Sequence, residues 1–245
     1  MLNIFFLLVG VGLLTAGGEL LIRGALGVSS RAGMSALLSG LLIVGFGTSM
    51  PELVVSVDAA LSGQPEIAIG NVIGSNIANI LLILGLCAVI TPLVISPLSL
   101  RRDSLVVMAS SFLFILLAFD GFLSIVDALI LLSLLVLYLG WAYWTERDNS
   151  APSAEVHKGE AAEIRLLEKS IAWTVTEIIA GLVLLILGSQ VLLKGAVGIA
   201  GGLGVSEAVI GLTLVAVGTS LPELSTCIIA AMKRQSDIII GNILG

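Results

Sequence analysis

Two glutamates lie in the middle of long apolar stretches of this sequence. Glu52 and Glu223 each follow a Gly-Thr-Ser-x-Pro block. A carboxylate within an apolar segment of membrane length is costly, and it is a functional residue by default. No basic residue lies inside the predicted core segments, which disfavours the alternative of a structural ion pair. We therefore interpret both carboxylates as candidate cation ligands.

The residues beside each glutamate add uncharged oxygen donors. A threonine and a serine precede each one, namely Thr48, Ser49, Thr219 and Ser220. Pro51 and Pro222 also precede them, and a proline within a helix removes one backbone hydrogen bond and displaces the carbonyl four residues back. Those carbonyls belong to Gly47 and Gly218. Hard oxygen donors without Cys or His predict a site for Ca²⁺ or Na⁺ rather than for a transition metal.

A third apolar stretch adds more polar side chains. Asn71, Ser75 and Asn79 are four residues apart and share one face of a helix. Small polar residues with glycines also join helices without binding ions, and for Asn71 and Asn76 both interpretations stay open. Ser75 and Asn79 would lie at the depth of Glu52, so we expect these two to be ligands.

The composition defines the environment of these side chains. The chain has 245 residues, of which 58% are hydrophobic and 11% charged, whereas soluble domains carry about 25% charged residues. Its apolar runs are long enough to cross a hydrocarbon core of roughly 30 Å. With a pI near 4.7 and no basic stripe, a nucleic-acid partner is excluded. The sequence therefore predicts an all-α polytopic protein of the lipid bilayer.

The hydropathy pattern divides the chain into two membrane parts. The predicted spans are 2–22, 36–62, 67–91, 104–119, 123–143, 171–194 and 207–232, with an eighth starting near Ile238. A polar linker at 145–170 separates a first transmembrane region, 1–144, from a second, 171–245.

Basic residues predict the orientation of the spans. The loops after the first, third, fifth and seventh spans hold all but one of the 11 basic residues: Arg23, Arg31, Arg101, Arg102, Arg147, Lys158, Arg165, Lys169, Lys233 and Arg234. Cytoplasmic loops are enriched in Lys and Arg. We therefore expect the linker 145–170 in the cytoplasm and the N-terminus outside, with the first span retained rather than cleaved as a signal peptide.

The sequence also repeats itself. Residues 17–74 align without gaps with residues 188–245 at an offset of 171, most strongly through Gly-Thr-Ser-x-Pro-Glu-Leu at 47–53 and 218–224. The two copies are five membrane crossings apart, and five is odd, so they run in opposite directions. This pattern predicts the inverted-repeat architecture of many secondary transporters, with a site at the bilayer midplane.

These motifs, together with Gly-Asn-Val-Ile-Gly-Ser-Asn-Ile-Ala-Asn at 70–79, resemble the two α-repeats of the sodium/calcium exchangers, within the cation/calcium antiporter superfamily and closest to its prokaryotic members. The resemblance implies five plus five transmembrane helices. It implies that Gly45 and Ala216 bind the ion through backbone oxygens. It also implies these side-chain ligands: Thr48, Ser49, Glu52, Ser75, Asn79, Thr219, Ser220 and Glu223. The chain stops at the partner of Gly74, so we expect it to be truncated within helix 8.

The resemblance implies a function as well. We expect a secondary antiporter, not an enzyme, that exchanges Na⁺ for Ca²⁺ by alternating access in a prokaryotic inner membrane. It would act as a monomer, with the transported ions as substrates and no cofactor. The cation/proton (Ca²⁺/H⁺) branch remains an alternative, although it typically has Gly-Asn-x-x-Glu where this chain has Thr-Ser-x-Pro-Glu. A cation channel is disfavoured because filters usually come from subunit rings, and the spans lack the catalytic sets of intramembrane hydrolases.

Overall fold

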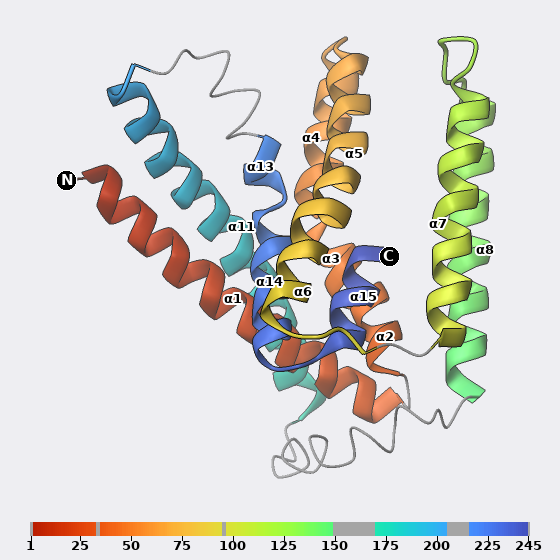
Figure 1. Cartoon of the computed structure of the whole chain (residues 1–245), viewed down its shortest axis with the longest axis horizontal. Helices are drawn as coiled ribbons and strands as arrows, with labels where there is room; N and C mark the ends of the chain where they lie inside the picture. Colours follow the sequence, from red (N-terminus) through yellow and green to blue (C-terminus); the bar gives the residue numbers. More distant parts are fainter. Residues whose placement is uncertain (1, 33–34, 95–96, 149–169, 205–215, 245) are drawn as a thin grey trace.

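The computed structural model describes residues 2–32, 35–94, 97–148, 170–204 and 216–244. Within these ranges every regular element is a helix and there are no strands, which confirms the predicted all-helical class. The helices α1 (Leu2–Ala32) and α11 (Ile171–Gly202) are the longest, and they cross in an antiparallel pair at one side of the molecule (Figure 1). Both extend beyond the predicted spans, since a helix can continue past the charged residue at which an apolar run ends.

Glycines bring the backbones of α1 and α11 into contact. They recur at every seventh position in both helices, at Gly10, Gly17 and Gly24 and at Gly181, Gly188 and Gly195. A Cβ atom added to Gly17 would lie 2.8 Å from the backbone nitrogen of Leu185. Small residues at such intervals let two membrane helices approach closely. This glycine spacing therefore sets the line along which the pair packs.

The contacts between α1 and α11 come in exchanged pairs. Gly17 packs on Leu185, and Gly188, the repeat partner of Gly17, packs on Leu14, the repeat partner of Leu185. The same exchange holds for three further pairs of contacts: Gly10 with Leu192 and Gly181 with Leu21; Gly24 with Ile178 and Gly195 with Leu7; Gly27 with Thr174 and Gly198 with Asn3. The sequence repeat is thus matched by a repeat of contacts.

The second predicted span is bent at its centre. It consists of α2 (Ala36–Ser39), a π-helical segment η1 (Gly40–Gly45), α3 (Phe46–Thr48) and α4 (Met50–Leu61), with a bend of 43° between α3 and α4. Pro51 lies in the first turn of α4, where the N–H that proline lacks would have no partner within that helix. The break falls at Ser49, as the proline predicted.

The second half contains a matching break. The short helix α13 (Ala216–Thr219) is followed by a break at Ser220. The next helix, α14 (Leu221–Met232), has Pro222 in its first turn. The helix α15 (Ser236–Leu244) follows and is almost entirely buried. It packs closely on η1, where a Cβ atom added to Gly40 would lie 2.9 Å from the carbonyl oxygen of Ile238.

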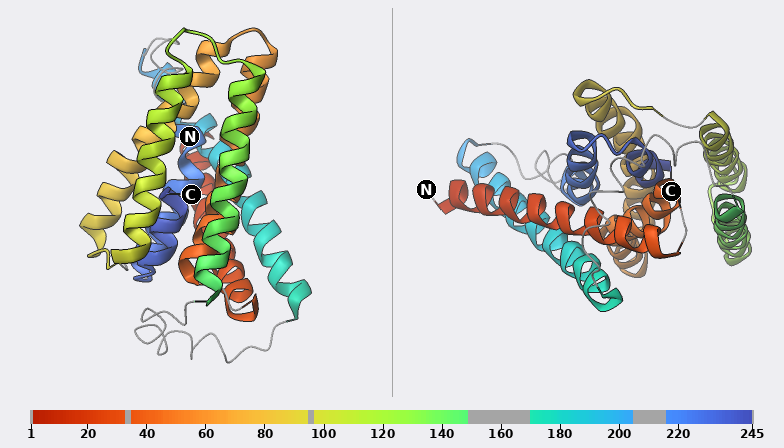
Figure 2. Two further views of the ribbon diagram at one scale, coloured as in Figure 1. Left: turned by 90° about the vertical axis from the view of Figure 1, so that its right-hand side faces the viewer. Right: turned by 90° about the horizontal axis from the view of Figure 1, so that it is seen from below.

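After α4 the chain forms one continuous span and one hairpin. The span consists of α5 (Pro65–Ala78), a second π-helical segment η2 (Asn79–Leu84) and α6 (Gly85–Ile90). The hairpin consists of α7 (Pro97–Leu117) and α8 (Ile125–Asp148), and the right-hand view in Figure 2 shows it apart from the crossing pair.

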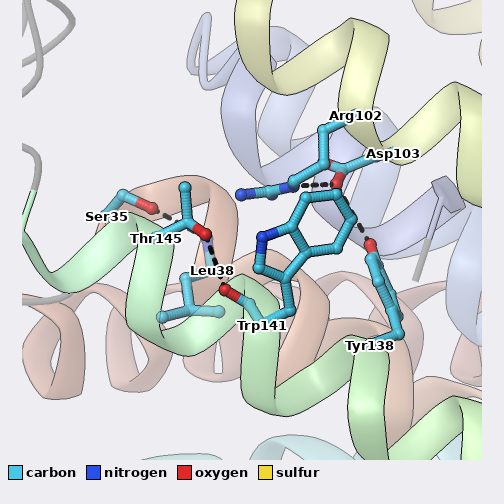
Figure 3. Close-up of polar contacts among 7 residues, drawn as sticks. All are labelled: Ser35, Leu38, Arg102, Asp103, Tyr138, Trp141 and Thr145. Carbon is cyan, nitrogen blue, oxygen red and sulfur yellow. Dashed lines mark hydrogen bonds and ion pairs between the residues drawn. The ribbon is translucent and has the colours of Figure 1, made fainter.

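Polar contacts join the two helices of the hairpin to each other (Figure 3). The buried Asp103 pairs with Arg102, whose Nε lies 2.6 Å from Asp103 Oδ1, and Tyr138 donates a hydrogen bond to the same oxygen over 3.2 Å. Leu38 of α2 belongs to a small apolar cluster with Ala142 of α8. The cluster attaches the first half of the bent span to the hairpin.

Four described helices are long and apolar enough to cross a membrane: Leu2–Ala32, Pro65–Ile90, Ile125–Thr145 and Ile171–Gly202. The bent pair Ala36–Thr48 and Met50–Leu61 makes a fifth if it is one span. The predicted span 104–119 falls in α7, which is not among them because every stretch of membrane length in α7 includes Arg101, Arg102 and Asp103. The predicted span 207–232 and the linker 145–170 lie partly outside the described residues.

Candidate cation site

The two glutamates lie at corresponding points of the two breaks. Glu52 is in the first turn of α4 and Glu223 in the first turn of α14. Their exposed fractions are 8% and 1%. The N-terminus of a helix carries a partial positive charge from its free N–H groups, so it stabilises a nearby carboxylate. The proline breaks therefore create two helix starts inside the protein and place a buried acid at each.

Each glutamate is held by a hydroxyl from the opposite half of the chain. Ser49 Oγ donates to Glu223 Oε1 over 3.1 Å, and Ser220 Oγ donates to Glu52 Oε1 over 3.3 Å. These two bonds are related by the offset of 171, as are the two serines and the two glutamates. The structure thus brings together four predicted site residues in one crossed arrangement, in which Ser220 is buried and Ser49 is exposed.

The two threonines of the motifs follow the same crossed arrangement. Thr219 also lies within interaction distance of Glu52, and Thr48 of Glu223. Thr48 is 1% exposed, and its Oγ1 lies 2.9 Å from the carbonyl oxygen of Val44 as a further acceptor. Both predicted threonines therefore lie beside the carboxylates.

The other oxygen of each carboxylate has no hydrogen-bond partner. Glu52 Oε2 and Glu223 Oε2 are both buried without one, and so is Asn79 Oδ1. An unpaired buried polar atom costs about 1–3 kcal/mol, and more when it is charged. Native proteins keep such atoms where water or an ion binds. The free oxygens are of the hard type that Ca²⁺ and Na⁺ prefer.

The predicted backbone ligands lie in the turns before the glutamates. The carbonyl oxygen of Gly45 accepts the N–H of Ser49 over 3.1 Å, and the hydroxyl of Thr48 lies 3.3 Å from the same oxygen. Ala216 is the residue at the equivalent position, and α13 begins there. Both lie close in sequence to the hydroxyls of the site, as the motif predicts.

The structure places Ser75 and Asn79 on the span that neighbours α14. Ser75 Oγ donates to the carbonyl oxygen of Asn71 over 2.7 Å, so its proton is used within its own helix. Asn79 begins η2, which contacts α14. Single π turns within helices often occur at functional sites. Asn79 therefore combines a free buried oxygen with an irregular backbone.

Asn71 and its repeat partner Asn242 join helices near the site. Asn71 Nδ2 donates to the Ser56 hydroxyl over 3.0 Å. Asn242 is 4% exposed, accepts a hydrogen bond from Thr48 over 3.1 Å, and donates to Cys227 Sγ over 3.0 Å. Sequence reasoning did not select Asn242 as a site residue, although the repeated Gly-Asn pair at 70–71 and 241–242 was the available signal.

The site contains few charged ligands. Among the described residues, no group of three or more His, Cys, Asp and Glu side chains could hold a metal ion. The two carboxylates of Glu52 and Glu223 are the charged groups that the motifs contribute to this site.

An all-helical membrane protein with broken helices and buried acids near its centre belongs to the class of ion transporters. Residues 2–144 and 173–245 match the family described as "Sodium/calcium exchanger protein". The chain therefore belongs to the sodium/calcium exchanger family, whose members are cation antiporters of the membrane.

Individual relatives agree with this assignment. The sodium/calcium exchanger MaX1 of Methanosarcina acetivorans is 30% identical over 275 residues, which cover 99% of this chain and 78% of the relative. The inner membrane protein YrbG of Escherichia coli is 34% identical over 245 residues, covering 98% of this chain and 74% of the relative. A structure of the sodium-calcium exchanger NCX_Mj soaked with Na⁺ and Sr²⁺ has a TM-score of 0.84 at 31% identity, covering 100% of this chain and 78% of that one.

Proposed function

We propose that this antiporter exchanges Na⁺ for Ca²⁺ at a site between Glu52 and Glu223. The observation that carries the proposal is the crossed pair of serine–glutamate hydrogen bonds, which leaves one free buried oxygen on each carboxylate. One Ca²⁺ or several Na⁺ ions would neutralise the two charges. Because an unpaired buried charge is costly, either ion leaves the site readily only when the other replaces it.

The proposed site draws on ten residues. Its charged ligands are the two glutamates, and its neutral ones are the hydroxyl, amide and backbone oxygens of Gly45, Thr48, Ser49, Ser75, Asn79, Ala216, Thr219 and Ser220. A relative named as a sodium/calcium exchanger and structures of a homologue soaked with Na⁺ and Ca²⁺ or Sr²⁺ support this choice of substrates.

Alternating access would use the two halves of the chain as inverted repeats of five plus five helices. The exchanged contacts of α1 with α11 and the crossed serine–glutamate bonds support this arrangement, since a two-fold relation between the halves requires such reciprocity. The N-terminus would lie outside and the linker 145–170 in the cytoplasm of a prokaryotic inner membrane. One chain would be the functional unit, because both carboxylates come from the same chain.

The driving ion is tested by uptake into proteoliposomes that contain the protein. We expect ⁴⁵Ca²⁺ uptake to follow an outward Na⁺ gradient, and a proton gradient of comparable size to do little. Uptake driven by protons alone would assign the protein to cation/proton exchange instead. Uptake that never exceeds electrochemical equilibrium for Ca²⁺ would indicate a channel.

A further inference from the structure

A second group of metal-ligating side chains lies beside the carboxylate site. Cys87 and Cys227 are the 2 cysteines of the sequence, both are free thiols, and their exposed fractions are 0% and 1%. Cys87 is on α6 and Cys227 on α14, two helices that pack together. Each thiol interacts with the other. Two helices from opposite halves of the chain thus present a pair of sulfur ligands to one point.

The surroundings of the thiol pair are apolar on most sides. Both cysteines belong to the main hydrophobic cluster, which also contains Ile83. The polar neighbour is Asn242, whose Nδ2 lies 3.0 Å from Cys227 Sγ and whose Oδ1 accepts from Thr48. A chain of polar groups therefore leads from the candidate cation site to the thiols.

We propose that Cys87 and Cys227 form a binding site for a soft divalent cation. Thiolates select soft ions, whereas Ca²⁺ and Na⁺ prefer oxygen. Binding forms two metal–sulfur bonds, and each thiol releases one proton to water. The resulting complex of one divalent ion and two thiolates is neutral, so its burial among apolar side chains avoids the cost of an uncompensated charge.

An ion held by both thiols would join the span 65–90 to the helix that carries Glu223. Cys227 follows Glu223 by four positions, about one helical turn. Occupation of the thiol site would therefore restrain the position of Glu223 and slow ion exchange. This consequence rests on the proposed function, whereas binding to the thiols does not.

The internal repeat supplies a matched variant for the test. Ser56 is the repeat partner of Cys227, and its hydroxyl accepts a hydrogen bond from Asn71 over 3.0 Å, as Cys227 accepts one from Asn242. Cys227→Ser therefore keeps a hydrogen-bond acceptor in a setting where serine already occurs. Cys87→Ala is the second variant, since alanine suits a helix interior.

The probe is Cd²⁺ alone, added to the reduced, purified chain in detergent with excess Ca²⁺ to occupy the oxygen site. We expect one Cd²⁺ per chain, the ultraviolet charge-transfer absorbance of Cd–thiolate bonds, and slower alkylation of both thiols when Cd²⁺ is bound. Either variant should weaken Cd²⁺ binding by about 100-fold or more, since loss of an outer-shell partner alone costs about 10–100-fold.

Two results would overturn the proposal: no thiolate absorbance in the wild-type chain, or equal Cd²⁺ affinity in the wild-type chain and both variants. Stoichiometry and thiol protection in the wild-type chain decide the question even if a variant does not fold. Because Cd²⁺ binding is read without transport, its failure leaves Na⁺/Ca²⁺ exchange intact, and a failure of exchange leaves Cd²⁺ binding intact.

Discussion

At the scale of single residues, the two oxygens of each glutamate in the candidate site have different surroundings. One oxygen of Glu52 accepts from Ser220 and one of Glu223 accepts from Ser49, while the second oxygen of each has no partner. The serines orient the carboxylates, and the free oxygens carry the capacity to bind a cation. Charge and orientation are thus supplied by different side chains, so their removal should have different effects.

Glu52→Gln or Glu223→Gln keeps the shape of the side chain but removes one negative charge. Coulomb attraction scales with the charge of the ion, so a divalent ion loses about twice what a monovalent ion loses. We expect each variant to lower Ca²⁺ affinity by roughly 100-fold, about 2.7 kcal/mol, and to abolish ⁴⁵Ca²⁺ flux while some Na⁺ binding remains. Calorimetry and initial flux measure the two effects.

Asp58→Asn is the matched control for this prediction, because Asp58 is an exposed carboxylate on the same helix as Glu52. It should transport Ca²⁺ normally. Near wild-type Ca²⁺ flux in either glutamine variant would rule out the paired-carboxylate site.

Asn242→Ala should affect both stability and the site. It removes one hydrogen bond from Thr48 and one to Cys227, and each such bond contributes about 0.5–1.5 kcal/mol. We expect a lower melting temperature and weaker Ca²⁺ binding. Asn76→Ala is the control, since Asn76 is exposed and donates to Val72 within its own helix; equal losses in both variants would contradict a specific role for Asn242.

At the scale of helices, two kinds of irregularity position the site. Proline breaks at Ser49 and Ser220 create helix starts inside the protein, and the π segment η1 ends at Gly45 while η2 begins at Asn79. A π turn shifts the side chains that follow it around the helix axis. Both kinds of irregularity therefore occur at residues that are predicted to supply ligand oxygens.

The crossing of α1 and α11 yields a prediction about glycine. In Gly17→Ala the new methyl group would meet the backbone nitrogen of Leu185 at 2.8 Å, and backbone cannot move aside as a side chain can. We expect a loss of roughly 1–3 kcal/mol, as for other overpacked sites, measured as a lower melting temperature in detergent. Gly12→Ala in the same helix meets nothing within 4 Å and should be neutral or stabilising; a similar melting temperature for the two variants would contradict the close contact.

At the scale of the whole molecule, the distribution of basic residues predicts how the chain lies in the membrane. Ten of its 11 basic residues fall in loops assigned to one side, and such a bias marks the cytoplasmic face. The loop between α7 and α8 should then lie outside, and the linker 145–170 inside.

Labelling of introduced cysteines tests this orientation. In a chain with Cys87→Ala and Cys227→Ser, Phe122→Cys should react with an impermeant thiol reagent added outside intact cells, because Phe122 is exposed in the loop before α8. Ser153→Cys in the linker should react only after the membrane is opened. The reverse pattern would invert the topology.

Much of this protein is determined by local sequence. Apolar runs of membrane length require helices because a lipid-exposed backbone must satisfy its own hydrogen bonds, and the Pro51 and Pro222 positions specify where two of those helices break. The paired Gly-Thr-Ser-x-Pro-Glu blocks identify the candidate oxygens, because a carboxylate in an apolar span is too costly to occur in both halves without a role.

Tertiary structure alone decided which groups meet. The bonds from Ser49 to Glu223 and from Thr48 to Asn242 join the first half of the chain to the second, and so does the contact of Cys87 with Cys227. Hydropathy and helical periodicity report which face of a helix is buried but not which neighbour buries it. Hydrogen bonds require a fit to within a few tenths of an ångström, and that fit exists only once α1 has packed on α11 and α15 on η1.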